Sequence, residues 1–194
     1  MVEDGTMTSS ADRPDRAPGL HSPEIEPDQK DWTWVLRHRC PDCGFDVGLV
    51  PAAEVAARLR ENAARWPAVC SRDESAVRPE PGVWSPLEYA CHVRDVCQVF
   101  EARVNLMRSE VNPTFGSWNQ DDAAIAGAYS AQDPDVVSVE LLAAAEAAAG
   151  SFDALVDGDW QRTGRRTNGS IFTLETLGQY FLHDLTHHLH DVHG

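Results

Sequence analysis

The sequence contains no long run of apolar residues. No stretch approaches the roughly 18 consecutive apolar residues of a membrane-spanning helix. Residues 1–31 also lack the apolar core of a secretory signal. From these two absences we expect a cytoplasmic protein that has no membrane partner. Lysine is nearly missing as well, because Lys30 is the only one, whereas arginine and alanine are common. That bias is typical of a GC-rich genome.

Basic charge is scarce. The chain has 16 lysine and arginine residues against 31 aspartate and glutamate residues, which gives a formal net charge of −15. A surface this acidic repels the phosphates of nucleic acids and of anionic lipids, so we expect no nucleic-acid partner. The same surface raises the local concentration of cations, metal ions included.

The number of cysteines is odd. There are five of them, which in a cytoplasmic chain argues against a disulfide framework. Cys40 and Cys43, with Pro41 and Gly44, form a Cys-x-x-Cys turn shaped like a metal-binding knuckle. A structural zinc site normally needs two such pairs. His38 or a distant cysteine could complete the site, or the pair could be redox-active.

No strand pattern of useful length and no internal repeat is present. Residues 1–30 are rich in Pro, Ser, Asp and Glu and cannot bury enough surface to offset the entropy of ordering, which predicts a mobile tail. Residues 31–50 form a segment that carries the cysteine pair. Residues 51–194 carry helical patterns throughout and form one predicted domain.

Four helices are expected in that domain. The first begins at Pro51, the second at the capping box Ser85-Pro86-Leu87-Glu88, and the third at Asp133-Pro134. The second runs to about Glu110, and the third to about residue 156. The fourth is capped by Thr173 and runs almost to the C-terminus. A short helix over 122–129 follows a polar loop. The pattern predicts an all-α four-helix bundle.

Histidines crowd the last helix. His183 and His187 are four residues apart, so they share one helix face and place two imidazoles side by side for one metal ion. His92 is the only histidine of the second helix and lies within an apolar pattern, which makes it the candidate third ligand. Three neutral imidazoles would bind zinc or nickel and leave a coordination position open.

Other interpretations of these histidines stay open. Asp184 and His188 have the same spacing on a neighbouring face and form a rival pair. A lone histidine such as His92 is often an ordinary core residue. His188, His190 and His193 could be solvated residues, favoured near a helix C-terminus.

Two segments resemble a known family. Cys91-His92-Val93-Arg94-Asp95 and the segment YFLHDLTHH, residues 180–188, are similar to the DinB superfamily, over a region from about residue 51 to the end. That group includes YfiT-like metal hydrolases and mycothiol-dependent maleylpyruvate isomerases. The resemblance implies a DinB-like four-helix bundle, with one ligand histidine on the second helix and an His-x-x-x-His pair on the fourth. It carries metal ligation to His92, His183 and His187.

The resemblance also implies a chemistry. Several members of the superfamily are transferases or isomerases that use a low-molecular-weight thiol such as mycothiol, whose sulfur would bind the metal as a thiolate. The implied partners are a small-molecule thiol and an electrophilic substrate. Two alternatives are a metal-dependent hydrolase and a non-catalytic metal-binding stress-response protein. The oligomeric state is left open, a homodimer included.

Four further residues are candidates for the site. Asp95 follows His92 by three residues and could orient its imidazole, although an ion pair or solvation explains it equally well. Asp122 could act as a base or as a helix cap. Trp118 could form a pocket wall. Arg166, in the basic loop 158–169, could bind a carboxylate of a thiol cofactor or substrate, or it could be solvated.

Overall fold

The computed structural model describes residue 25 and residues 30–194. The predicted mobile tail, residues 1–30, therefore lies outside the described residues except at its Ile25 and Lys30. In the described part, no helix is both long and apolar enough to span a bilayer. Most of it is helical, in agreement with the predicted all-α class.

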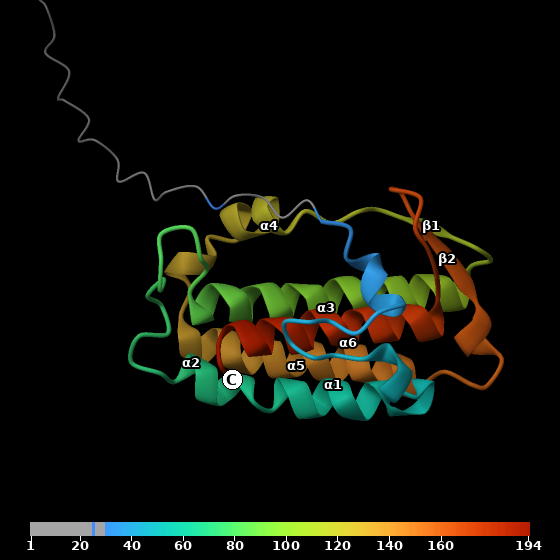
Figure 1. The fold of residues 1–194 in the computed structure, drawn as a ribbon, viewed down its shortest axis with the longest axis horizontal. Helices are drawn as coiled ribbons and strands as arrows, with labels where there is room; N and C mark the ends of the chain where they lie inside the picture. Colours follow the sequence, from blue (N-terminus) through green and yellow to red (C-terminus); the bar gives the residue numbers. More distant parts are fainter. Residues whose placement is uncertain (1–24, 26–29) are drawn as a thin grey trace, which may run out of the picture.

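Four helices lie side by side as a bundle (Figure 1). They are α1 (Val55–Ala63), α3 (Pro86–Ser109), α5 (Pro134–Asp153) and α6 (Leu174–Asp191). α3 and α1 each pack against both α5 and α6, so apolar faces of all four helices meet in one core. The predicted four-helix bundle is confirmed.

The start of α3 follows from its capping box. The Ser85 hydroxyl accepts a hydrogen bond from the Glu88 backbone N–H (3.2 Å), and the Glu88 carboxylate accepts one from the Ser85 N–H (2.8 Å). Arg78 donates to both oxygens of the same carboxylate, at 2.8 and 2.5 Å. Glu88 is only 2% exposed and Arg78 is half-buried, so this end of α3 is fixed by an ion pair with a buried carboxylate.

The first helix of the bundle is interrupted, unlike the single helix predicted from Pro51. A 3-10 turn (Ala52–Glu54) precedes α1, and a separate α2 (Trp66–Cys70) follows it. Pro67 lies in the first turn of α2. Proline has no N–H to donate back to the preceding turn, so α1 ends and a new helix begins where that donor is unnecessary.

The other helix starts agree with their capping signals. Asp133 caps α5 and Thr173 caps α6. α5 ends at Asp153, slightly before the predicted end. The short helix α4 (Gln120–Ala126) begins before the predicted residue 122, because the side chain of Asn119 accepts the backbone N–H groups of Asp121 and Asp122. Asn119, and not Asp122, is the helix cap.

A small sheet replaces part of the predicted basic loop. β1 (Thr114–Phe115) pairs in parallel with β2 (Thr163–Arg166), which pairs antiparallel with β3 (Ile171–Thr173). Strands of two to four residues are too short to leave an alternating pattern in the sequence. A Cβ at Gly164 would lie 2.8 Å from Met107, so glycine lets β2 pack directly against α3. The sheet holds Arg166 beside the bundle.

Residues 31–50 cross over α6 (Figure 1). A 3-10 helix, Trp32–Leu36, packs against α6. The chain then turns tightly, because the Cys40 N–H donates to the Phe45 carbonyl (2.8 Å) and the Gly44 N–H donates to the Cys40 carbonyl (3.0 Å). Gly44 has a φ of +76°, which glycine adopts without strain. This turn brings the cysteine pair onto α6.

Candidate metal centre

The side chains of α6 contribute to two groups of metal-ligand atoms. Among the residues that the structure describes, these are the groups of three or more His, Cys, Asp or Glu whose ligand atoms all lie within 4.8 Å of one another. We call the first the His–Asp–His cluster: His92, Asp184 and His188. We call the second the Cys2His2 cluster: Cys40, Cys43, His183 and His187.

The structure divides the predicted ligand set between these groups. His92, from α3, faces Asp184 and His188, whereas His183 and His187 face the cysteine turn. A helix rotates by about 100° per residue, so adjacent residues lie on different faces. The pair of residues 183 and 187 and the pair of residues 184 and 188 therefore cannot bind the same ion. We therefore revise the expected partners of His92 to the rival pair, Asp184 and His188.

The His–Asp–His cluster has the spacing of a metal site. Asp184 Oδ1 lies 3.5 Å from His92 Nε2 and 3.6 Å from His188 Nε2. Two ligand atoms that each lie about 2.1 Å from zinc at a tetrahedral angle are about 3.4 Å apart. The same distances are too long for good hydrogen bonds. The three atoms are thus arranged to share a cation rather than to bond one another.

The burial of these side chains also indicates a metal site. His92 is 1% exposed, and neither of its ring nitrogens has a hydrogen-bond partner. Asp184 Oδ1 is also buried without one. Burying polar atoms without partners costs stability, so native proteins rarely leave them unsatisfied. A divalent cation bound between these side chains would satisfy the carboxylate oxygen and one nitrogen of His92.

The ionisation states also fit a cation. Burial lowers the pKa of His92, which keeps its imidazole neutral and able to ligate. Burial opposes ionisation of Asp184, but the contacts with His92 and His188 outweigh it, and the pKa ends below its usual value. Near neutral pH, His92 therefore offers a nitrogen lone pair and Asp184 an anionic oxygen.

Asp191 orients the His188 ring. Its Oδ2 lies 3.1 Å from His188 Nδ1, which leaves Nε2 directed at the cluster. For Asp95, the sequence left two interpretations open, orientation of the His92 imidazole and an ion pair or solvation. The structure favours the ion pair, because the Asp95 carboxylate accepts hydrogen bonds from Tyr129 Oη (2.5 Å) and Arg94 Nε (2.8 Å). The spacing of His188 and Asp191, three apart on one helix, was the signal available for Asp191.

Comparisons with known proteins identify the family and the fold of the chain. A family model described as the DinB superfamily matches residues 68–192, which include α3 and α6. The chain belongs to the DinB superfamily. Its fold is also similar to that of YfiT from Bacillus subtilis, described as "a probable metal-dependent hydrolase with an unusual four-helix bundle topology", with a TM-score of 0.63. That similarity covers 72% of this chain and 82% of YfiT at 19% identity. No curated protein matches the sequence.

In this DinB-superfamily chain, the His–Asp–His cluster opens onto a cavity of about 660 Å³. All three cluster residues line it. Trp118 lines the cavity too and stacks on His92, with ring centroids 5.4 Å apart. Trp84 lies 5.3 Å from the same ring. These indole rings cover one side of the cluster and limit its contact with water.

The same cavity of the DinB-superfamily chain contains two guanidinium groups. Arg103, which sequence reasoning missed, and Arg166 both line it, and neither has a carboxylate of the described residues within 4 Å. Burial and the charge of Arg166 lower the pKa of Arg103 to about 10, so it stays charged at neutral pH. Asp122, by contrast, is exposed and does not line the cavity, which removes the basis for a catalytic role.

Proposed function

We propose that this chain is a divalent-metal-dependent enzyme that holds its ion on His92, Asp184 and His188. The observation that carries the proposal is the set of buried ligand atoms at the wall of a cavity. Three protein ligands leave a coordination position for a substrate, which is typical of catalytic rather than structural metal sites. Zinc or nickel suits two imidazoles and one carboxylate.

The cavity supports a small anionic substrate. One carboxylate and two neutral imidazoles leave a net positive charge around a divalent ion. Arg103 and Arg166 add two positive charges in the same cavity, and neither is within 4 Å of the carboxylates of Asp31, Asp121 and Asp191 that also line it. Guanidinium groups bind carboxylates through paired hydrogen bonds. We infer that the substrate presents an anionic group to Arg103 and Arg166 while its reacting atom lies at the His–Asp–His cluster.

For the reaction, we propose transfer or isomerisation with a low-molecular-weight thiol such as mycothiol. A bound ion would lower the pKa of a thiol or water molecule in its open position. The volume of about 660 Å³ supports this choice, because a thiol and an electrophile must occupy the cavity together. Asp191 would keep the His188 ring oriented during the reaction.

A hydrolase is the second candidate. It is supported by the structural similarity to the Bacillus subtilis protein described as a probable metal-dependent hydrolase. The same ligands would serve, with water in place of the thiol. A third candidate, a metal-binding protein without catalysis, would require the ion to have no open position.

Incubation of the zinc-loaded protein with mycothiol and an electrophile tests these candidates. We expect free thiol to be consumed only with metal-loaded protein. His188→Ala should abolish this loss, and His190→Ala, on the same helix but in neither cluster, should not. Metal-dependent cleavage of ester or amide substrates without thiol would favour the hydrolase. The absence of both activities would contradict an enzymatic role for the site.

A further inference from the structure

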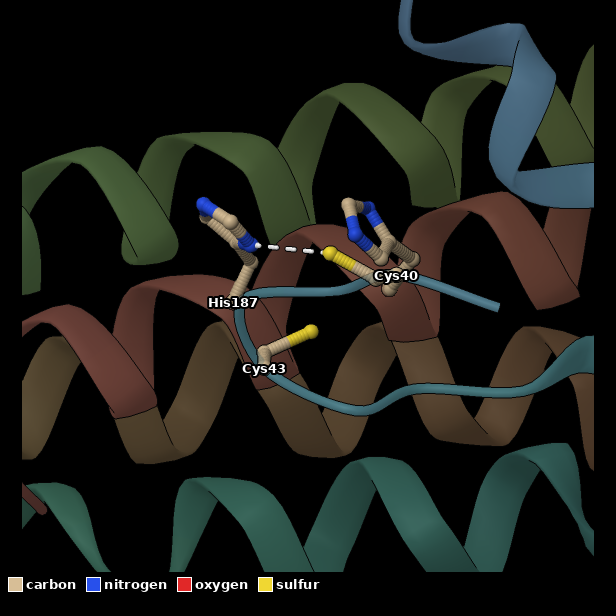
Figure 2. Close-up of side chains that lie close together, drawn as sticks. Cys40, Cys43 and His187 are labelled. Carbon is tan, nitrogen blue, oxygen red and sulfur yellow. Dashed lines mark hydrogen bonds between the residues drawn. The ribbon is translucent and has the colours of Figure 1, made fainter. Parts of the chain in front are cut away.

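The Cys2His2 cluster is a second donor set that shares no ligand with the site proposed above, although its two histidines line the same cavity. Cys40 Sγ lies 3.7 Å from His187 Nδ1, although 147 positions separate the two residues in the chain. A sulfur about 2.3 Å from zinc and a nitrogen about 2.1 Å from it, at a tetrahedral angle, are about 3.6 Å apart. Figure 2 shows the side chains of Cys40, Cys43 and His187 converging on one space between the turn and α6.

Two of the cluster's four side chains are buried, and Cys43 and His187 are half-buried. Cys40 is 0% exposed and His183 is 3% exposed, and His183 Nε2 has no hydrogen-bond partner. The indole of Trp32 packs against both imidazoles, with ring centroids 5.6 Å from His183 and 5.0 Å from His187. Phe45 packs against His183 at 5.5 Å. An apolar shell of this kind surrounds many bound metals and excludes competing ligands.

The nitrogen of His187 that faces away from the sulfur points toward a carboxylate. His187 Nε2 lies 3.8 Å from Asp191 Oδ1. A carboxylate near the outer nitrogen of an imidazole favours the tautomer in which the inner nitrogen can bind a metal. The inner nitrogen is Nδ1, the atom that faces Cys40 Sγ.

We propose that Cys40, Cys43, His183 and His187 bind one zinc ion in a closed, tetrahedral, structural site. Binding would release the two thiol protons to solvent. Two thiolates and two neutral imidazoles would then balance the charge of Zn²⁺, which favours a buried position. All four positions are filled by protein, so this ion is structural. The proposal does not depend on the reaction assigned to the His–Asp–His cluster.

The structural role follows from the location of the ligands. Two come from the turn at residues 40–43 and two from α6, so the ion fastens the segment 31–50 to that helix. Trp32 of this segment lines the large cavity, and Asp184 and His188 each follow a Cys2His2 ligand directly in the chain. The zinc ion would therefore hold one cavity wall and fix the rotation of α6.

A redox-active cysteine pair is the competing explanation. A redox pair needs only its two sulfur atoms side by side. Here the ligand atoms of two imidazoles from α6 lie within 4.8 Å of both sulfur atoms. A disulfide would also leave the His183 nitrogen without a partner and give no reason for two imidazoles beside the turn. The geometry therefore favours a metal over a redox pair.

Metal content tests the proposal directly. Protein purified under reducing conditions with zinc should hold two equivalents, and Cys40→Ser with Cys43→Ser should hold one. The matched control is Cys70→Ser, because Cys70 is buried on α2 outside both clusters. It should keep both. His92→Ala should lose only the ion of the other cluster. Retention of two equivalents by the double variant would overturn the proposal.

The cysteine variants could fail to fold, so a second test uses spectroscopy of His92→Ala. This variant keeps the cysteine turn unchanged. Cobalt in place of zinc should give thiolate-to-metal charge-transfer absorption in the near ultraviolet. X-ray absorption of the zinc form should show two sulfur neighbours at about 2.3 Å. No sulfur neighbour, or a Cys40–Cys43 disulfide in metal-free purified protein, would show that the cysteines do not bind zinc.

Discussion

The two clusters share α6 but are built in different ways. The His–Asp–His cluster joins two helices of the bundle, and its His92 is on a helix whose start is fixed by the Glu88–Arg78 ion pair. The Cys2His2 cluster joins α6 to a turn with little regular structure. The first offers three protein ligands, which all line the cavity, whereas the second offers four, of which the two histidines line it. The difference separates a site suited to chemistry from one suited to holding the chain together.

The largest expected effect is on activity, which should depend on the ligands of the His–Asp–His cluster. His188→Ala and His92→Ala each remove a ligand of the ion in the cavity. We expect turnover to fall by more than the about 10–100-fold that is typical of changes to outer contacts of a metal site. The fold should persist, which circular dichroism can check. A Cys40→Ser variant with equally low turnover but an intact fold would remove the functional distinction between the clusters.

For thermal stability we expect the larger loss when the ion of the Cys2His2 cluster is removed. Zinc at about 1,000 times its dissociation constant stabilises a folded chain by about 4 kcal/mol. For a chain of this size that corresponds to roughly 8–16 °C in Tm. Chelation should lower the Tm of the unmodified protein by an amount of this order. The double variant Cys40→Ser with Cys43→Ser should show most of this decrease in Tm without chelator. Calorimetry with and without chelator measures both. An unchanged Tm in the double variant would contradict a structural ion.

Asp191→Asn should affect both clusters, because its carboxylate faces an imidazole of each. We expect metal affinity at the His–Asp–His cluster to fall by about 10–100-fold. The loss at the Cys2His2 cluster should be smaller, since the distance of 3.8 Å from His187 is too long for a direct hydrogen bond. Competition titrations with a chelating dye measure both affinities. Equal losses would show that Asp191 supports the two rings alike.

The smallest effect concerns the support of α3. Burial opposes ionisation of Glu88, but the hydrogen bonds from Arg78 and Ser85 outweigh it and hold its pKa below the usual value. A lowered pKa in the folded state contributes stability above the unfolded-state pKa, and this is lost as pH falls through the folded value. Glu88→Gln should cost about 1–3 kcal/mol at pH 7 and flatten the acid dependence of unfolding. Urea titrations at pH 7 and pH 4 test this. An unchanged acid dependence would show that the pair does not hold α3.

Much of the bundle could be predicted because its signals are local. Ser85 with Glu88, Asp133 and Thr173 mark three helix starts, and each caps its helix in the structure. The break at Pro67 was also visible in principle, since proline removes a helical hydrogen bond. The three short strands were not predictable, because they are too short to show an alternating pattern and because β1 pairs with β2 from about fifty residues away.

The candidate site was harder to predict, because α6 contains two overlapping pairs with the same spacing. His183 with His187 and Asp184 with His188 differ only in which face meets α3, and packing against the rest of the bundle decides that. The partners of the cysteine turn are about 140 residues away, so no spacing rule could assign them. The residue types were informative, but the grouping depends on tertiary structure.

The crowding of α6 has a consequence for its tolerance of change during evolution. From residue 183 to residue 191, His and Asp occupy both clusters and their outer contacts, while Leu185 and Leu189 fill the core. Few positions remain where a substitution would be neutral. A single inserted residue would rotate both pairs by about 100° in the same direction and disrupt both centres at once. We therefore expect this helix to change more slowly among close relatives than α5, whose outer face carries no ligands.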